Sequence, residues 1–174
     1  MAEPNQIKIA ETLIGYSNPT YFIADIAANH DGDLQRAKDL IYKAAESGAD
    51  AAKFQHFRAE TIVSDIAFKM MGGQLSHQSS WSKSVFEVYR DASLNIDWNF
   101  ELKDTCRDAG IHFLTTPYDL DIVDKIAEDV PAIKIGSGDI TWHEMIVKVA
   151  KKQKPYFLAT GASNLNEVKS AVEI

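Results

Sequence analysis

Residues 134–139 read KIGSGD and combine a lysine, a hydroxyl, a carboxylate and two glycines. Lys134 lies in a short apolar segment, where its ammonium needs an anionic partner because apolar surroundings disfavour an isolated charge. Ser137 adds a hydroxyl, and the glycines on either side of it let the backbone approach a bound group closely. This stretch therefore predicts a site for an oxyanion such as phosphate or carboxylate.

A second lysine, Lys53, lies in the apolar run 51–57 (AAKFQHF), and Gln55 shares its face because side chains two apart on a strand point the same way. Two lysines directed at one place need an anion between them, or each lowers the pKa of the other. The alternative is that each lysine pairs with its own carboxylate, and Asp25 and Asp139 are available for this.

The other candidates also follow apolar runs. Asp25 and Asp139 are candidate general acids or bases, with a structural ion pair as the alternative. His30 is a candidate proton carrier or ligand, with a hydrogen-bonding role in its loop as the alternative. The remaining histidines have no metal-site spacing, so no metal ligand is predicted within this sequence. The candidate substrate-binding residues are Asn29, Lys53, Gln55, Thr115, Lys134 and Ser137, and further polar positions at predicted strand ends are Thr116, Thr160 and Gly161.

Five apolar runs, each followed by a helical pattern, would position these side chains: residues 21–28, 51–57, 111–116, 132–135 and 155–160. Apolar strands that alternate with amphipathic helices predict parallel βα units, either in an open doubly wound sheet or in a (β/α)8 TIM barrel. Polar residues follow all five runs, whereas an open sheet concentrates them at one switch point. The expected fold is therefore an α/β barrel, of which about the first five βα units are present.

Two segments lie outside this pattern. Residues 1–20 are predicted to be an N-terminal extension whose apolar part, 7–14, forms a short hairpin or a plug. Residues 58–96 are too long for an ordinary connection and predict a lid-like insertion in the barrel portion 21–174, with an inert surface excursion as the alternative. Because residue 174 falls inside a helical pattern, we expect the sequence to be the N-terminal part of a longer protein, without its C-terminal domain.

Composition excludes several classes of partner. The 174 residues carry a net charge of -7, which disfavours nucleic acid as the main partner because a phosphate backbone requires a basic face. No stretch approaches the roughly 20 apolar residues of a membrane span, and the N-terminus lacks a basic start. The single cysteine, Cys106, excludes an internal disulfide. We expect a cytoplasmic protein.

Four stretches, in this order, resemble the sialic acid synthase (N-acetylneuraminate synthase) family: IADIAANHDGDLQRAKDLIYKAAESGADAAKFQ, FLTTPYD, KIGSGD and ATGASNLNEV. The resemblance covers about residues 21–174. It implies a TIM barrel that condenses phosphoenolpyruvate with an N-acetylmannosamine-type sugar, giving a nonulosonic acid and phosphate. It also implies a divalent metal, Mn or Mg, and a homodimer for the full-length enzyme.

The resemblance assigns roles by motif. Lys53, Thr115 and Lys134 would bind phosphoenolpyruvate, Ser137 its phosphate, and Asp139 would contact the reacting centre. Three further residues match the family in position, but their roles are less defined: Asn29, His30 and Gln55. The sequence departs from the family at Asp25, where glutamate is common, and at Ala159, where serine is frequent. The metal-binding histidines are expected on later strands, so we expect this chain alone to be inactive.

Two other functions remain open. One is a barrel aldolase or synthase that uses a three-carbon phosphorylated or pyruvate substrate, with Lys53 or Lys134 as a Schiff-base nucleophile. The other is a half-barrel assembly module without catalysis, since half a barrel exposes two sheet edges.

Overall fold

A computed structural model describes residues 6–70 and 80–174 of the chain. The first five residues of the predicted N-terminal segment lie outside the described residues. So do residues 71–79 of the predicted insertion, which include Gly72, Gly73 and His77.

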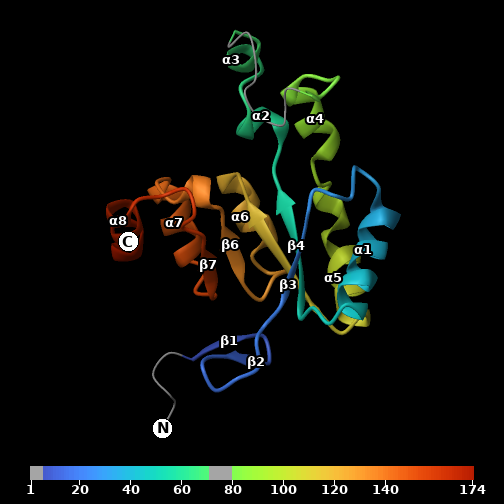
Figure 1. The fold of residues 1–174 in the computed structure, drawn as a ribbon, viewed down its shortest axis with the longest axis vertical. Coiled ribbons are helices and arrows are strands. Elements are labelled where there is room, and N and C mark those ends of the chain that lie inside the picture. Colours follow the sequence, from blue (N-terminus) through green and yellow to red (C-terminus); the bar gives the residue numbers. More distant parts are fainter. Residues whose placement is uncertain (1–5, 71–79) are drawn as a thin grey trace.

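Five parallel strands form the main sheet, and each pairs with the next strand along the chain (Figure 1). This sequential order is typical of a (β/α)8 barrel, whereas a doubly wound sheet reverses its order at a switch point. The predicted α/β fold, with about five units of a barrel, is confirmed. The observed strands are shorter than most of the predicted runs: β3 Ile23–Ala27, β4 Ala51–His56, β5 His112–Pro117, β6 Ile133–Ile135 and β7 Tyr156–Leu158.

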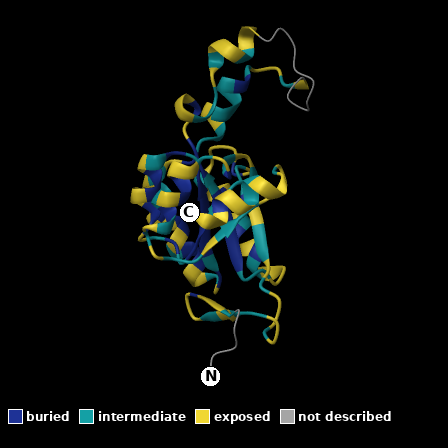
Figure 2. Cartoon of the chain, turned by 90° about the vertical axis from the view of Figure 1, so that its left-hand side faces the viewer, coloured by how far each residue is buried: buried dark blue, intermediate teal, exposed yellow. Residues whose placement is uncertain are grey.

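One face of the sheet packs against helices. Phe54, Phe113 and Ile133 from the strands join buried helix residues such as Ile41 and Ile146 in a single apolar core. Figure 2 shows this buried layer between sheet and helices. The helices of the layer are α1 Leu34–Glu46, α5 Asn99–Asp108, α6 Leu120–Ile126, α7 His143–Ala150 and α8 Leu165–Glu173.

The long connection after β4 contains, within its described residues 57–70 and 80–95, three short α-helices: α2 Ala59–Ile62, α3 Asp65–Met70 and α4 Val85–Ala92. They project beyond the carboxyl end of β4, which is the end where barrel sites lie (Figure 1). Ser84 and Glu87 form a capping box that fixes the start of α4. Part of the predicted insertion is therefore ordered helix placed above the strand ends.

Residues near the N-terminus form an antiparallel hairpin of β1 Ile7–Ile9 and β2 Thr12–Ile14, at the opposite end of the sheet. Ile9 is fully buried against Ala51, Leu114 and Ala132. The segment was predicted to be a hairpin or a plug. It is a hairpin, and Ile9 of this hairpin also closes the amino end of the strands.

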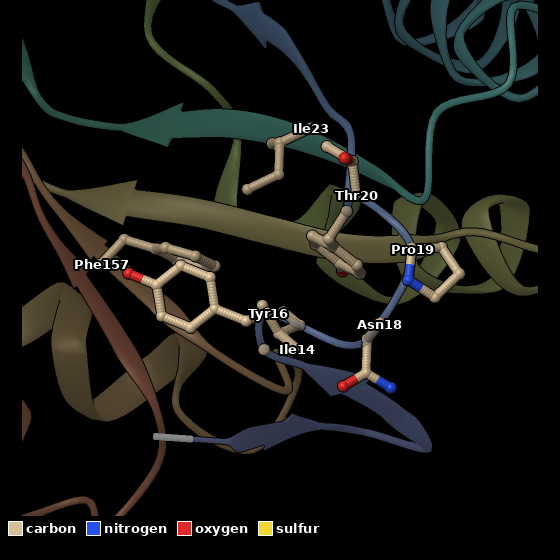
Figure 3. Close-up of a pocket in the computed structure, with 9 residues that line it drawn as sticks. Ile14, Tyr16, Asn18, Pro19, Thr20, Ile23 and Phe157 are labelled. Carbon is tan, nitrogen blue, oxygen red and sulfur yellow. The ribbon is translucent and has the colours of Figure 1, made fainter. Parts of the chain in front are cut away.

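An apolar pocket of about 500 Å3 lies beside this hairpin (Figure 3). Ile23 of β3 and Phe157 of β7, the two edge strands, contribute to its wall together with Tyr16 and Tyr21 of the segment that follows the hairpin. The strands at the two edges of the sheet thus contribute to one shared apolar wall.

Replacing Ile9 with alanine should lower the free energy of unfolding by about 2 kcal/mol, because it removes a buried side chain at the amino end of the strands. Urea unfolding measures this change. Leu13→Ala is the matched control on the same hairpin, where the side chain is 46% exposed and the loss should stay within about 0.5 kcal/mol. Equal losses for the two variants would contradict the plug.

Candidate active site

The two lysines singled out in the sequence lie on the same face of the sheet. Lys53 pairs in register with Asp25 of β3 and with Leu114 of β5, so these three side chains share a face. Ile133 pairs with Thr115 on the helix side, which places the adjacent Lys134 on the other face. We call this the inner face, and its polar residues are Asp25, Lys53, Gln55, Thr116 and Lys134. Lys53 and Lys134 are separated by one strand, β5.

Only Lys53 has a carboxylate partner. Its side chain is 3% exposed, and its Nζ lies 2.8 Å from Asp25 Oδ1. Burial lowers the pKa of Lys53; the Asp25 carboxylate opposes this shift and the Lys134 ammonium adds to it. Among the described residues no ion pair involves Lys134, so the alternative of separate pairing holds for one lysine and not for the other. The inner face therefore carries two ammonium groups. That of Lys53 is paired with the Asp25 carboxylate, and that of Lys134 has no counter-ion among the described residues.

The loop after β6 brings a carboxyl group and a phenol together. Ser137–Asp139 forms a short 3-10 turn. A Cβ on Gly136 would lie 3.0 Å from Asp139 Oδ2 and 3.4 Å from Tyr118 Oη, so glycine leaves room for both groups. Burial raises the pKa of Asp139, which favours its protonated form at higher pH than usual.

Tyr118 is a site residue that the sequence reasoning missed. Its Oη accepts a 3.3 Å hydrogen bond from Gln55 Nε2, which joins the loop after β5 to the inner face. Burial, with the nearby Asp139 and Asp25 carboxylates adding, raises the pKa of Tyr118 to about 12. The phenol therefore stays protonated at neutral pH and can donate a hydrogen bond. The available signal was its position in FLTTPYD, directly after the end of a strand.

The two adjacent threonines of β5 face opposite ways. Thr115 Oγ1 lies 2.7 Å from His56 Nδ1, and His56 Nε2 lies 2.7 Å from Asn99 Oδ1 of α5, so this chain of contacts runs into the helix layer. Thr116 pairs in register with Gln55 on the inner face, and its buried Oγ1 has no hydrogen-bond partner among the described residues. The structure thus places Thr116, and not the predicted Thr115, on the face that carries the two lysines.

His30 and Asn29 lie in the turn after β3, and the His30 ring points to the helix side of the sheet. The His30 ring is fully buried, with its centroid 6.4 Å from that of Phe54 on the helix side and 6.1 Å from that of Trp98. Asn29 Nδ2 donates to the Ile26 carbonyl and closes the turn after β3. The pairing register shifts between Asp25 and Ala27, where Ala27 has a φ of 54°, and this irregularity directs His30 into the helix layer. Both residues organise the loop in this structure.

Thr115→Val should lower the free energy of unfolding by about 1–2 kcal/mol, because it leaves the buried His56 Nδ1 without its partner. Thr116→Val should change it by less than about 0.5 kcal/mol, because the hydroxyl that is removed has no partner to lose. Urea unfolding of the two isosteric variants makes the comparison. A larger loss for Thr116→Val would contradict the assignment of faces.

The described part of the chain contains neither a cluster of metal-ligating side chains nor a helix able to span a membrane. In residues 6–70 and 80–174, no three His, Cys, Asp or Glu side chains gather in a group that could hold a metal ion. Over the same residues, every helix falls short of the length and apolar character that crossing a bilayer requires.

A sequentially paired parallel sheet, with ammonium, carboxylate and hydroxyl groups on one face near the carboxyl ends of its strands, defines part of a (β/α)8-barrel protein. The NeuB family model matches residues 40–174, well over half of the sequence. The chain belongs to the NeuB family.

Several curated relatives are named as synthases of legionaminic acid, N-acetylneuraminate 9-phosphate or pseudaminic acid. The N,N'-diacetyllegionaminic acid synthase of Campylobacter jejuni is 38% identical over 156 residues, covering 89% of this chain and 46% of the relative. The human N-acetylneuraminate-9-phosphate synthase is 33% identical over 162 residues, covering 92% of this chain and 44% of the relative. The chain spans about half the length of the curated relatives it matches.

Solved structures support the fold. An N-acetylneuraminic acid synthetase of Leptospira borgpetersenii superposes with a TM-score of 0.80 at 26% identity, covering 97% of this chain and 54% of that one. A truncated 3-deoxy-D-arabino-heptulosonate 7-phosphate synthase of Thermotoga maritima has a TM-score of 0.63 at 16% identity over 95% of this chain and 48% of that one, a likeness of fold alone.

Proposed function

We propose that the full-length protein condenses phosphoenolpyruvate with an N-acetylmannosamine-type sugar, giving a nonulosonic acid and phosphate. In this proposal the present chain supplies the phosphoenolpyruvate half of the site. The observation that carries it is the inner face itself, where Lys53 and Lys134 lie together and only Lys53 has a carboxylate partner. A small anion with two or three negative charges would balance the positive charge of such a face.

Each inner-face group has a defined task in this proposal. Asp25 holds the Lys53 ammonium in place, so that Lys53 and Lys134 together bind the phosphate and carboxylate of phosphoenolpyruvate. The unpartnered Thr116 hydroxyl and Ser137 donate further hydrogen bonds to the same anion. Fixed donors of this kind need no reorganisation when charge develops during the reaction.

The bond changes balance without a redox partner. The methylene carbon of phosphoenolpyruvate (C3) attacks the aldehyde carbon of the open-chain sugar, and the aldehyde oxygen takes a proton and becomes a hydroxyl. Asp139, whose pKa is raised by burial, is the proton donor that the site offers for this step. Water then adds to C2, the carbon that carries the phosphate oxygen, and loses a proton, and phosphate leaves with cleavage of the bond between C2 and that oxygen.

A divalent metal, Mn or Mg, and a homodimer are expectations for the full-length enzyme. The described residues contain no group of three ligating side chains, so they do not fit a metal site by themselves, and no step above is assigned to a metal. A cytoplasmic location and the catalytic inactivity of the isolated chain belong to the same proposal.

Isothermal titration calorimetry of the chain with phosphoenolpyruvate tests the proposal. We expect saturable binding at one site, with competition by inorganic phosphate. Addition of N-acetylmannosamine and Mn²⁺ should give no phosphate release from this chain, whereas the full-length protein should release phosphate. If neither protein binds phosphoenolpyruvate, the proposal is wrong.

A Schiff-base aldolase is the second candidate, because the lowered pKa of Lys53 is a property of nucleophilic lysines. Its ion pair with Asp25 favours the protonated, non-nucleophilic form. Borohydride treatment in the presence of pyruvate distinguishes the two functions by mass spectrometry. A covalent adduct on Lys53 would favour the aldolase, and an unmodified chain is expected from the condensation.

A further inference from the structure

The proposed steps give no task to Tyr118, which lies beside their proton donor, Asp139. Tyr118 follows β5 and Asp139 follows β6, so the two side chains come from the ends of neighbouring strands. Gly136 lies against both of them, because a Cβ at this position would be 3.0 Å from Asp139 Oδ2 and 3.4 Å from Tyr118 Oη. The carboxyl group and the phenol therefore border the same small space.

Contacts on two sides fix the Tyr118 ring. Its centroid lies 6.3 Å from that of Phe57 in an edge-on arrangement, and its Oη accepts the 3.3 Å hydrogen bond from Gln55 Nε2. Because Gln55 donates to this oxygen, the phenol hydrogen itself is free to point to another acceptor. Within residues 6–70 and 80–174 the hydroxyl makes no second hydrogen bond. Tyr118 thus presents a donor that no described residue uses.

Asp139 lacks a partner that would stabilise its ionised form. No ion pair involves Asp139 among the described residues, and burial raises its pKa. The cations of the inner face have other partners, since Lys53 pairs with Asp25 and Lys134 is assigned to the anion in the proposed function. When Asp139 gives its proton to the aldehyde oxygen, a carboxylate is left in a half-buried place, where an unpaired charge costs free energy.

A phenol beside this carboxylate would act selectively on its ionised form. A hydrogen bond to an ionised acceptor is roughly twice as strong as one to a neutral acceptor. Such a bond therefore stabilises the state after proton transfer more than the state before it, which is the requirement for lowering a barrier. Burial, with the Asp139, Asp25 and Tyr89 side chains adding, raises the pKa of Tyr118 to about 12, so the phenol keeps its own proton.

We propose that Tyr118 is a positioning residue for proton transfer, whose phenol donates a hydrogen bond to the carboxylate that Asp139 becomes on protonating the sugar. The two oxygens are not hydrogen-bonded to each other in the structure, so rotation of the Asp139 carboxyl group toward the phenol is part of the proposal. Gly136 leaves room for this rotation, since a Cβ would lie against Oδ2. The inference rests on the proposed function, which supplies the proton acceptor.

Carbon-13 NMR of the carboxyl groups of the chain, titrated from neutral to acidic pH, tests the pairing. The signal that is missing in Asp139→Asn belongs to Asp139. Tyr118→Phe keeps the ring and removes the donor, so it should raise the pKa of Asp139 by about one unit, because a hydrogen bond to the charged form lowers a pKa. Circular dichroism melting shows whether each variant is folded.

Tyr89→Phe is the matched control, because the Tyr89 ring also packs against Phe57 and the substitution also removes a hydroxyl. It should leave the pKa of Asp139 unchanged. The other titratable groups of the inner face are retained in both variants: Asp25 of β3, Lys53 of β4 and Lys134 of β6. An unchanged Asp139 pKa in folded Tyr118→Phe, or an equal rise in Tyr89→Phe, overturns the inference.

Gly136→Ala gives a second test of the same pairing. Gly136 has a φ of -67°, which alanine adopts without strain, but the added Cβ would obstruct the Asp139 carboxyl group. This variant should raise the pKa of Asp139 by about one unit. Combined with Tyr118→Phe it should add little further, because both changes remove one interaction. Additive rises in the double variant would contradict the pairing.

Phosphate release by the full-length protein tests the role in the reaction. Tyr118→Phe should lower kcat between about three- and tenfold and leave the KM for phosphoenolpyruvate unchanged. The loss of activity at alkaline pH should begin about one unit higher, because the proton donor must be protonated and its pKa has risen. A raised Asp139 pKa with an unchanged kcat would overturn the role in proton transfer.

Calorimetry with phosphoenolpyruvate on the same samples separates this inference from the proposed function. If phosphoenolpyruvate binds and the pKa of Asp139 does not respond to Tyr118→Phe, the inference alone fails. If the pKa responds and phosphoenolpyruvate binds to neither the chain nor the full-length protein, the proposed function fails, and with it the role of the pair in this reaction.

Discussion

Lys134→Met should weaken phosphoenolpyruvate binding by about 30- to 100-fold and leave the free energy of unfolding nearly unchanged. Lys134 has no ion pair among the described residues, so its ammonium is free to bind an anion. Loss of one charge-assisted contact corresponds to roughly 2–3 kcal/mol, which gives the stated change in affinity. Stability should hold because the substitution also removes the repulsion that the Lys134 ammonium exerts on Lys53.

Lys103→Met is the matched control, since it removes the same charge from α5, where Lys103 pairs with Asp129. Calorimetry with phosphoenolpyruvate and urea unfolding supply the two readouts. Similar affinities for the Lys134 and Lys103 variants would show that the positive charge of the inner face is not directed at the anion. That result would remove the observation on which the proposed function rests.

Acidification from pH 7 to pH 4 should lower the free energy of unfolding by about 3 kcal/mol through His56 alone. Burial lowers the pKa of His56 from 6.5 to about 4, and each pKa unit corresponds to about 1.4 kcal/mol. Because the folded-state pKa lies below the unfolded value, the unfolded chain takes up the proton first. The stabilising contribution is therefore complete above pH 6.5 and is lost as the pH falls toward 4.

Urea unfolding at intervals between pH 7.5 and 4 measures this dependence. His56→Gln should reduce the slope in this window, although it also weakens the contacts to Thr115 and Asn99 at neutral pH. His143→Gln, at an exposed position of α7, should leave the slope as it is. Burial lowers the pKa values of His30 and His112 as well, so part of the slope should persist in His56→Gln. An unchanged slope in that variant would contradict the assignment.

The order of strands and helices could be predicted from the sequence because it depends on local patterns. Apolar runs of strand length with helical patterns between them gave five parallel strands, and the alternation within β4 placed Lys53 and Gln55 on one face. Asp33 caps α1, and Asn164 with Glu167 caps α8, through hydrogen bonds between groups two or three residues apart. In each case the deciding interaction lies within a few residues of the chain.

The features that the sequence could not predict are decided by tertiary contacts. In FLTT two apolar residues precede two threonines, so the pattern has no alternation that could assign Thr115 and Thr116 to a face; pairing with β4 decides it. The sequence also does not reveal that the His30 ring is buried beside Phe54 and Trp98, which lie far from it along the chain. Tyr118 becomes a site residue only because Gly136 and Gln55, distant in sequence, fold next to it.

The pairing of β4 with β5 has a consequence for folding and for variation among relatives. Gln55 and Thr116 are partners in register although the whole insertion separates them along the chain. Closing a longer loop adds only about 0.6 kcal/mol for each doubling of its length, but it delays the contacts that depend on closure. The segment between them can therefore gain or lose residues at little thermodynamic cost, while β5, β6 and β7 assemble independently of its length. Under the proposed function, changes in this segment would alter the accepted sugar without altering the strands whose side chains would bind the anion.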